Sequence, residues 1–200
     1  YRVTDGSNRP VRLNELLLVD SGAQYPDGTT DITRTIAVGD PGQEARECYT
    51  RVLQGLIAIS RVRWPRGLAG RDLDALARFN LWLAGMDYDH GTGHGVGAFL
   101  SVHEGPQRIA RISEVPLEPG MILSNEPGYY REGAFGIRLE NLIVVEEAAD
   151  LGDHRRQLSF ETLTFAPFDR RLILPDLLAP GEREWVDGYH ARVLELIGPR

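Results

Sequence analysis

Two strand-like segments that carry acidic residues constrain the fold of this chain more than any other feature. The apolar run Leu16–Val19 predicts a buried strand and leads directly into Asp20. A turn follows at Pro26–Gly28, where Pro and Gly are favoured. The β-rich segment Thr29–Val38, which contains Asp31, then predicts the returning strand of a hairpin. We expect Asp20 and Asp31 to face each other, because the midpoint between them falls at the turn.

Two carboxylates placed in this way need a positive partner. Directly opposed residues of an antiparallel pair have Cβ atoms roughly 4.5–5.5 Å apart, and like charges at that distance are destabilising. An aspartate taken alone is more often a loop or cap residue. Asp20 argues against that interpretation because it closes an apolar run, where an unpaired carboxylate is costly. The hairpin therefore predicts a cation between Asp20 and Asp31.

The same pattern occurs a second time, in the second half of the chain. Glu126 follows the strand-like run Met121–Asn125, and Glu140 lies within the run Phe135–Val145. The connecting segment 127–134 is rich in turn formers. Arg138 shares a strand face with Glu140, so it is placed to orient a carboxylate. The alternative is that both glutamates are surface residues on hairpin strands.

A histidine lies within an unusually glycine-rich segment. His94 is the central histidine of His90–Gly97, in which every second residue from Gly91 onward is glycine. Glycines at this density let the backbone approach a site closely. A single histidine is more often a surface or satisfied core residue. The glycines, together with His90 and His103 nearby, favour a functional role.

These residues form a set of ligands that is rich in oxygen. Four carboxylates and one imidazole suit hard or borderline ions such as Mn²⁺, with Zn²⁺, Co²⁺ or Fe²⁺ as alternatives. They exclude a structural zinc site made of cysteines. Two such ions roughly 3.5–4 Å apart can share a water and lower its pKa. The candidate metal ligands are Asp20, Asp31, His94, Glu126 and Glu140.

Composition narrows the class of protein. The net charge of −7 and the pI of about 5.3 argue against nucleic-acid and anionic-membrane partners, which require a basic face. The chain has no lysine, so Schiff-base and P-loop chemistry are excluded. No apolar run reaches the roughly 20 residues of a membrane span. Cys48 is the single cysteine, so no intrachain disulfide can form, which fits the cytoplasm.

The remaining segments predict an α+β fold with two central helices. One helix should begin at Asp40-Pro41-Gly42, with Asp40 as its N-cap, and end at or shortly before Pro65. A second should cover Asp72–Leu83. A final strand, Leu158–Ala166, precedes a helical tail that ends near Ile197. We expect this tail to pack against the protein, through Trp185, Tyr189, Val193, Leu194 and Ile197.

These motifs together resemble a known family. Asp20–Thr35, His90–Gly97, Val102–Pro106, Asn125–Tyr130 and Phe135–Asn141 resemble the Xaa-Pro aminopeptidases. The likeness is to the aminopeptidase P type of the pita-bread (creatinase/aminopeptidase) metallopeptidases. It implies a catalytic domain over 1–157 and a C-terminal extension over 158–200 packed on it. It also implies a fold truncated at its N-terminal side, because a substrate-binding histidine of the family would precede the tyrosine that matches Tyr1.

The resemblance further implies roles for the site residues. Asp20 and Asp31 would chelate one ion, Asp31 and Glu140 would bridge the two ions, and His94 and Glu126 would complete the second ion's shell. Glu126 would also shuttle a proton for a hydroxide that bridges the ions. His90 and His103 would contact substrate and stabilise the tetrahedral intermediate, and Tyr130 and Arg138 would support substrate binding by hydrogen bonds.

The implied reaction is removal of the N-terminal residue from peptides with proline second. Mn²⁺ is the expected metal, and the tail is expected to contribute to a homodimer. A prolidase, which cuts only Xaa-Pro dipeptides, would share all five ligands and is the main alternative. A non-catalytic pita-bread binding module is a third, but such relatives lose metal ligands, whereas this chain keeps them all.

Overall fold

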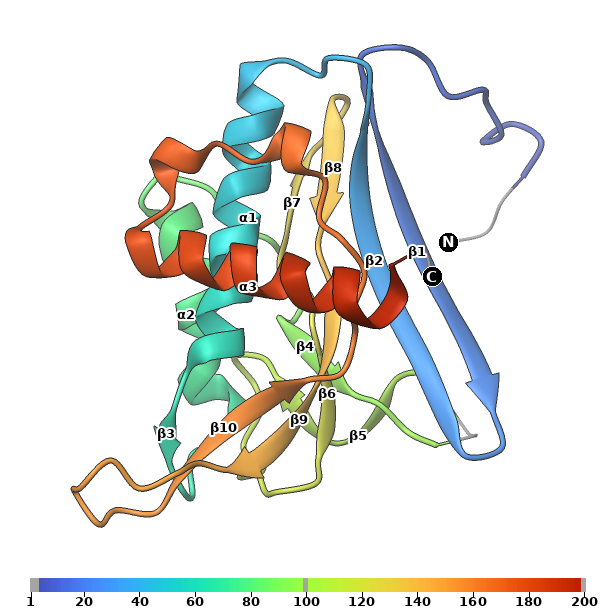
Figure 1. The fold of residues 1–200 in the computed structure, drawn as a ribbon. Coiled ribbons are helices and arrows are strands. Elements are labelled where there is room, and N and C mark those ends of the chain that lie inside the picture. The colour runs from blue at the N-terminus through green and yellow to red at the C-terminus, as the bar shows by residue number, and fades with distance from the viewer. Residues whose placement is uncertain (1–3, 99–100, 199–200) are drawn as a thin grey trace.

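A long antiparallel hairpin forms one side of the molecule, and two helices and a larger sheet form the rest (Figure 1). The computed structural model describes residues 4–98 and 101–198, so Tyr1 lies outside the described residues. The strands are β1 (Glu15–Tyr25), β2 (Gly28–Val38), β3 (Trp64–Pro65), β4 (Gly93–Gly95), β5 (Glu104–Ile109), β6 (Ile122–Asn125), β7 (Gly128–Arg131), β8 (Phe135–Arg138), β9 (Asn141–Glu147) and β10 (Gln157–Thr162). The helices are α1 (Gln43–Arg61), α2 (Gly70–Trp82) and α3 (Pro180–Ile197), with two short 3-10 turns at Arg170–Leu172 and Pro175–Leu177. The predicted α+β class is confirmed.

The strands form three sheets. The largest has the order β3-β10-β9-β6-β4-β5, and the hairpins β1-β2 and β7-β8 each form a sheet of two strands. Helices α1 and α2 cover one face of the large sheet, with Ile59 and Leu73 packed against Leu123 and Ile143. Burial of this face is the main force that holds helices and sheet together.

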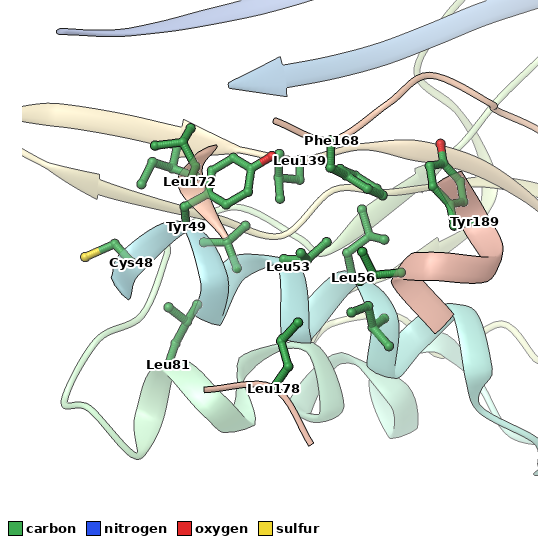
Figure 2. Packing of buried hydrophobic residues seen from close by; sticks show 14 of the residues in the cluster. Cys48, Tyr49, Leu53, Leu56, Leu81, Leu139, Phe168, Leu172, Leu178 and Tyr189 are labelled. Carbon is green, nitrogen blue, oxygen red and sulfur yellow. The ribbon is translucent and has the colours of Figure 1, made fainter. Parts of the chain in front are cut away.

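A second core lies between α1 and the C-terminal segment. In Figure 2, Tyr49, Leu53 and Leu56 of α1 point toward Phe168 and Tyr189. The side chains of Tyr49, Leu53 and Leu56 are fully buried. The tail is therefore packed on the helical layer as expected. Leu194 and Ile197 depart from the expectation, because they are 69% and 58% exposed.

The structure corrects the register of the first hairpin. Asp20 pairs with Thr33, and Asp31 pairs with Gly22, so the two aspartates are diagonal neighbours and not directly opposed. The turn is the two-residue connection between Tyr25 and Gly28, one residue later than a direct pairing requires. Because the shift between the aspartates is two residues, both side chains remain on the same face of the hairpin.

Three smaller predictions were also wrong in detail. Helix α1 begins at Gln43, and Asp40 accepts a hydrogen bond from the backbone of Gly42 and does not cap the helix. The run Phe135–Val145 is two strands, because β8 pairs with β7 while β9 pairs with β6 and β10. The segment 127–134, expected to be a connection, contains β7.

Within the described residues, no helix has the length and apolar character needed to cross a membrane.

Candidate metal centre

Three of the predicted ligands converge from three separate elements. One ligand atom each from Asp31 on β2, His94 on β4 and Glu140 between β8 and β9 lie within 4.8 Å of one another. They line a cavity of about 800 Å³, and Asp20 and Glu126 line the same cavity. The structure therefore brings all five predicted ligands to one cavity, three of them as a tight cluster.

The orientation of His94 favours metal binding. Its Nδ1 lies 2.9 Å from the carbonyl oxygen of Gly95, which can only accept, so Nδ1 carries the proton. In the neutral ring Nε2 then carries the lone pair, and it lies 3.4 Å from both Asp31 Oδ2 and Glu126 Oε1. This is the tautomer that a metal-binding histidine adopts.

The glycines around His94 are required by the packing of β4 between β5 and β6. A Cβ atom at Gly93 would lie 1.9 Å from the carbonyl oxygen of Ser124, and one at Gly95 would lie 2.1 Å from that of Glu104. No side chain fits at either position. The predicted close approach of the backbone is therefore real, and it places His94 next to β6, the strand that leads into Glu126.

Glu140 is held by the neighbouring strand β2. Thr33 Oγ1 donates to Glu140 Oε2 at 2.7 Å, and the Glu140 amide donates to the Thr33 carbonyl at 3.1 Å. Both residues are buried. Ser124 has the same relation to Glu126, donating from Oγ to Oε1 at 3.0 Å, and it also accepts from the backbone of His94.

Burial and mutual repulsion disfavour the ionised form of the two glutamates. Burial raises the pKa of Glu140 to about 8, and the charges of Glu126 and Asp31 act in the same direction. Burial likewise raises the pKa of Glu126 to about 7, although His94, Ser124 and Arg138 oppose the shift. Burial opposes protonation of His94, but contacts with Asp31 and Glu126 outweigh it and raise its pKa. The cluster thus carries negative charge for which the protein supplies too few positive partners.

Asp20 lies at the edge of this cluster and is paired with Arg138. Arg138 Nη2 donates to Asp20 Oδ2 at 2.5 Å, and its Nε donates to Thr33 Oγ1 at 3.2 Å. The Arg138 guanidinium also lies 3.7 Å from Glu126 Oε2. Asp20 is half-exposed, whereas the other carboxylates are mostly buried. Arg138 therefore orients a candidate ligand, as its place on the strand suggested.

His90 lines the same cavity and contacts Tyr130. Its Nδ1 lies 2.8 Å from the Gly91 carbonyl and therefore carries a proton, and its Nε2 lies 2.9 Å from the Tyr130 hydroxyl. That hydroxyl also accepts from Arg138 Nη1 at 3.1 Å, so it links His90 to Arg138. Burial lowers the pKa of His90 and favours the neutral ring.

His103 completes the set of predicted site residues. Its ring lies edge-on to that of His94, with centroids 4.2 Å apart, and it lines the same cavity. Two supporting residues, Thr33 and Ser124, were missed from the sequence. Each lies two residues before or after a carboxylate on the same strand face, which is the signal that could have identified them.

The chemistry of these groups fits divalent cations. Four carboxylates, two of them with pKa values that burial raises to about 7 and about 8, surround one imidazole. Oxygen and imidazole ligands in this proportion suit Mn²⁺, Zn²⁺ or Co²⁺. Bound cations would offset the repulsion and let both glutamates ionise. Strands of separate sheets and the segments that connect them thus gather these ligands around one cavity, which defines a site for divalent cations.

Comparison with known proteins identifies the family. The model of metallopeptidase family M24 matches residues 2–147, and that of the C-terminal region of peptidase M24 matches residues 156–200. The chain belongs to metallopeptidase family M24. It is 51% identical to a probable Xaa-Pro aminopeptidase P of Tuber melanosporum, over 98% of this chain and 32% of that protein.

Solved structures agree with this assignment and confirm the predicted pita-bread fold. The X-prolyl aminopeptidase of Caenorhabditis elegans, described as a cytosolic enzyme with a di-nuclear active site, superimposes with a TM-score of 0.92 and 41% identity, covering 96% of this chain and 32% of that one. The prolidase of Pyrococcus horikoshii OT3 has a TM-score of 0.67 and 32% identity, covering 82% and 44%. The chain thus spans about a third of the length of these aminopeptidases.

Proposed function

We propose that this chain carries the dinuclear metal centre of an Xaa-Pro aminopeptidase, which removes the N-terminal residue from peptides with proline second. The observation that carries the proposal is the position of His94 Nε2, 3.4 Å from carboxylate oxygens of both Asp31 and Glu126. Similarity to the fungal and nematode aminopeptidases supports the substrate class.

The proposed ligands divide between two ions. Asp20 and Asp31 would hold one ion, His94 and Glu126 would hold the other, and Asp31 and Glu140 would serve as ligands to both. When bound, the two ions would polarise the scissile carbonyl and lower the pKa of a shared water. The mutual distances within the cluster of Asp31, His94 and Glu140 support this assignment.

The remaining residues act on substrate and protons. Glu126 accepts the proton of the attacking water and passes it to the leaving proline nitrogen. His90 and His103, which line the same cavity, contact the peptide and stabilise the developing oxyanion. Tyr130 and Arg138 orient His90 and Asp20 through the hydrogen bonds described above.

A prolidase is the second candidate, because prolidases share the fold. Two observations favour the aminopeptidase. The first is that residues 156–200 match the C-terminal region of peptidase M24. The second is that the chain superimposes on the nematode aminopeptidase with a TM-score of 0.92, but on the archaeal prolidase with a TM-score of only 0.67. The experiment is hydrolysis by the full-length protein, with added Mn²⁺, of an Xaa-Pro dipeptide and of a longer Xaa-Pro-Xaa peptide. Turnover of the longer peptide supports the aminopeptidase, and turnover of the dipeptide alone would establish a prolidase.

Four further properties form part of the proposal. The metal is Mn²⁺, in line with the oxygen-rich ligands. Residues 1–157 form the catalytic domain, and 158–200 form an extension packed on it. The location is cytosolic, as described for the nematode relative. The protein is a homodimer, for which the exposed Leu194 and Ile197 at an apolar groove of the tail offer a surface. Metal analysis and sedimentation measurements test the first and last of these.

A further inference from the structure

A buried ion pair in helix α2 lies next to the segment that carries His90. Asp74 and Arg78, one helical turn apart, are only 1% and 2% exposed. Arg78 Nε donates to Asp74 Oδ2 at 2.7 Å, and Nη2 donates to Asp74 Oδ1 at 3.1 Å. Such a pair is rarely more stabilising than well-packed apolar residues of the same size, because both charges lose their hydration.

The rest of the Arg78 guanidinium binds the backbone that leads into the cavity. Nη1 donates to the Tyr88 carbonyl at 2.6 Å and to Asp87 Oδ1 at 2.8 Å. Nη2 donates to the His90 carbonyl at 2.8 Å. With the two bonds to Asp74, these contacts use all five donors of the guanidinium. Arg78 thus holds two carbonyls of one loop in a rigid planar fork.

Aromatic and hydroxyl contacts fix the same segment from the side. The Arg78 guanidinium lies 3.8 Å from the centroid of the Tyr88 ring, and that ring lies 4.8 Å from the ring of His90. Thr92 Oγ1 donates to Asp74 Oδ1 at 2.7 Å, and the Thr92 carbonyl accepts from the backbone of Glu126. The ion pair therefore supports the loop on both sides of His90.

We infer that Arg78 is a positioning residue for His90: its bonds to the Tyr88 and His90 carbonyls set the place of the imidazole, and Asp74 holds Arg78 in register. The inference rests on the proposed function of His90 in binding substrate. Arg78 does not line the cavity among the described residues, so it acts through the loop. The orientation that Arg78 maintains is the one in which His90 Nε2 lies within hydrogen-bond distance of the Tyr130 hydroxyl.

The test uses Arg78→Lys in the metal-loaded protein. Lysine keeps the charge next to Asp74, but its single ammonium cannot hold both carbonyls in a planar fork. We expect kcat to fall roughly 100-fold with a smaller change in KM, because small displacements of a group that acts on the reacting peptide are costly. Arg51→Lys is the matched control: Arg51 donates to the Asn80 carbonyl and links α1 to α2 without contact to the loop. It should leave kcat unchanged.

A double-variant cycle separates positioning from a general structural role. If Arg78 acts through His90, adding Arg78→Lys to His90→Ala should lower kcat by less than about threefold, because the group it positions is already gone. The same large loss in both backgrounds would overturn the inference. Should Arg78→Lys fail to fold, Asp87→Asn removes one partner at the more exposed end of the network, and it should show a smaller loss with the same dependence on His90.

A readout that needs no turnover keeps the inference distinct from the proposed function. In the Zn²⁺-loaded protein with ¹⁵N-labelled histidine, the ring nitrogens of His90 should report a fixed Nδ1–H tautomer. Arg78→Lys should shift them toward the averaged pattern of a free ring, while Arg51→Lys should not. Unchanged ring signals in Arg78→Lys would overturn the inference. The expected shift in a protein that hydrolyses no Xaa-Pro peptide would uphold the positioning and refute the proposed function.

Discussion

Thr33 and Glu140 bond to each other twice: the threonine hydroxyl donates to the carboxylate at 2.7 Å, and the glutamate amide donates to the threonine carbonyl at 3.1 Å. The pair joins β2, which carries Asp31, to the corner between β8 and β9 that carries Glu140. These two hydrogen bonds thereby fix the position of Glu140 relative to Asp31, and both residues belong to the tight cluster of candidate ligands.

Thr33→Val should weaken metal binding while keeping the shape of the side chain. The carboxylate of Glu140 loses the donor that orients it, and loss of such a partner typically costs roughly 10–100-fold in metal affinity. Calorimetric titration with Mn²⁺ measures the change. Thr50→Val is the control, since Thr50 is also buried and hydrogen-bonded but lies on α1 away from the cavity. Equal affinities of Thr33→Val and the unaltered protein would contradict this role.

Asp31→Asn should abolish peptidase activity and lower the metal content. The amide keeps the size of the side chain but removes the charge that we assign to bridging two ions. Metal analysis after dialysis gives the readout, and Asp27→Asn, at the tip of the same hairpin, serves as the control. An unchanged metal stoichiometry in Asp31→Asn would count against bridging.

The metal-free protein should lose stability as the pH rises. Glu126 and Glu140 have pKa values of about 7 and about 8 in the folded state, above the ordinary value of 4.5. The folded state therefore binds more protons than the unfolded state between these limits, so the free energy of unfolding falls with rising pH across this window. His94, whose pKa is also raised, contributes with the same sign.

Thermal unfolding in a chelator, followed from about pH 5 to about pH 8, measures this slope. Excess Mn²⁺ should remove most of the decline, because the ions favour ionised carboxylates. The variant Glu126→Gln/Glu140→Gln should show a flatter profile, whereas Glu114→Gln, an exposed position, should match the unaltered protein. A melting temperature of the metal-free protein that rises over this range would refute the account of the cluster.

Arg34→Met should destabilise the fold by about 2–4 kcal/mol. The Arg34 guanidinium donates to the carbonyls of Thr33 and Glu140 on one side, and to the Ala166 carbonyl and the Tyr189 hydroxyl on the other. Methionine would remove one hydrogen-bond donor from each of these partly buried acceptors. Denaturant unfolding measures the loss. Arg46→Met should lose far less, because Arg46 reaches the C-terminal segment through one exposed bond to Arg171. Similar losses in the two variants would contradict the linking role of Arg34.

Much of the fold followed from local patterns, because hairpins and amphipathic helices depend on neighbours in the sequence. The first hairpin, helices α1 and α2, and the tail helix were predicted within a few residues. The pairing register of Asp20 and Asp31 was not predicted correctly. A shift of two residues keeps the same side chains on the same face, so the sequence pattern fits both registers equally well. The break between β8 and β9 was missed because both halves are apolar and only their partners differ.

The position of the candidate site residues was also predicted in part from the sequence. The five candidate ligands and His90 line one cavity, as glycine spacing and carboxylates on or next to strands suggested, and their roles in binding metal and substrate stay predictions. The proposed role of Arg78 was not predicted, because the sequence of helix α2 alone suggests only packing. The contact between Arg78 and the His90 carbonyl depends on how the helix packs next to that loop. Contacts between an arginine and backbone carbonyls leave no pattern in the residues that accept them.

Anomalous diffraction from crystals grown with Mn²⁺ tests the central claim most directly. We predict two peaks in the cavity, one in contact with Asp20 and Asp31 and the other with His94 and Glu126, with the carboxylates of Asp31 and Glu140 touching both. Peaks absent from the cavity at saturating Mn²⁺, or a single peak there, would contradict the dinuclear centre.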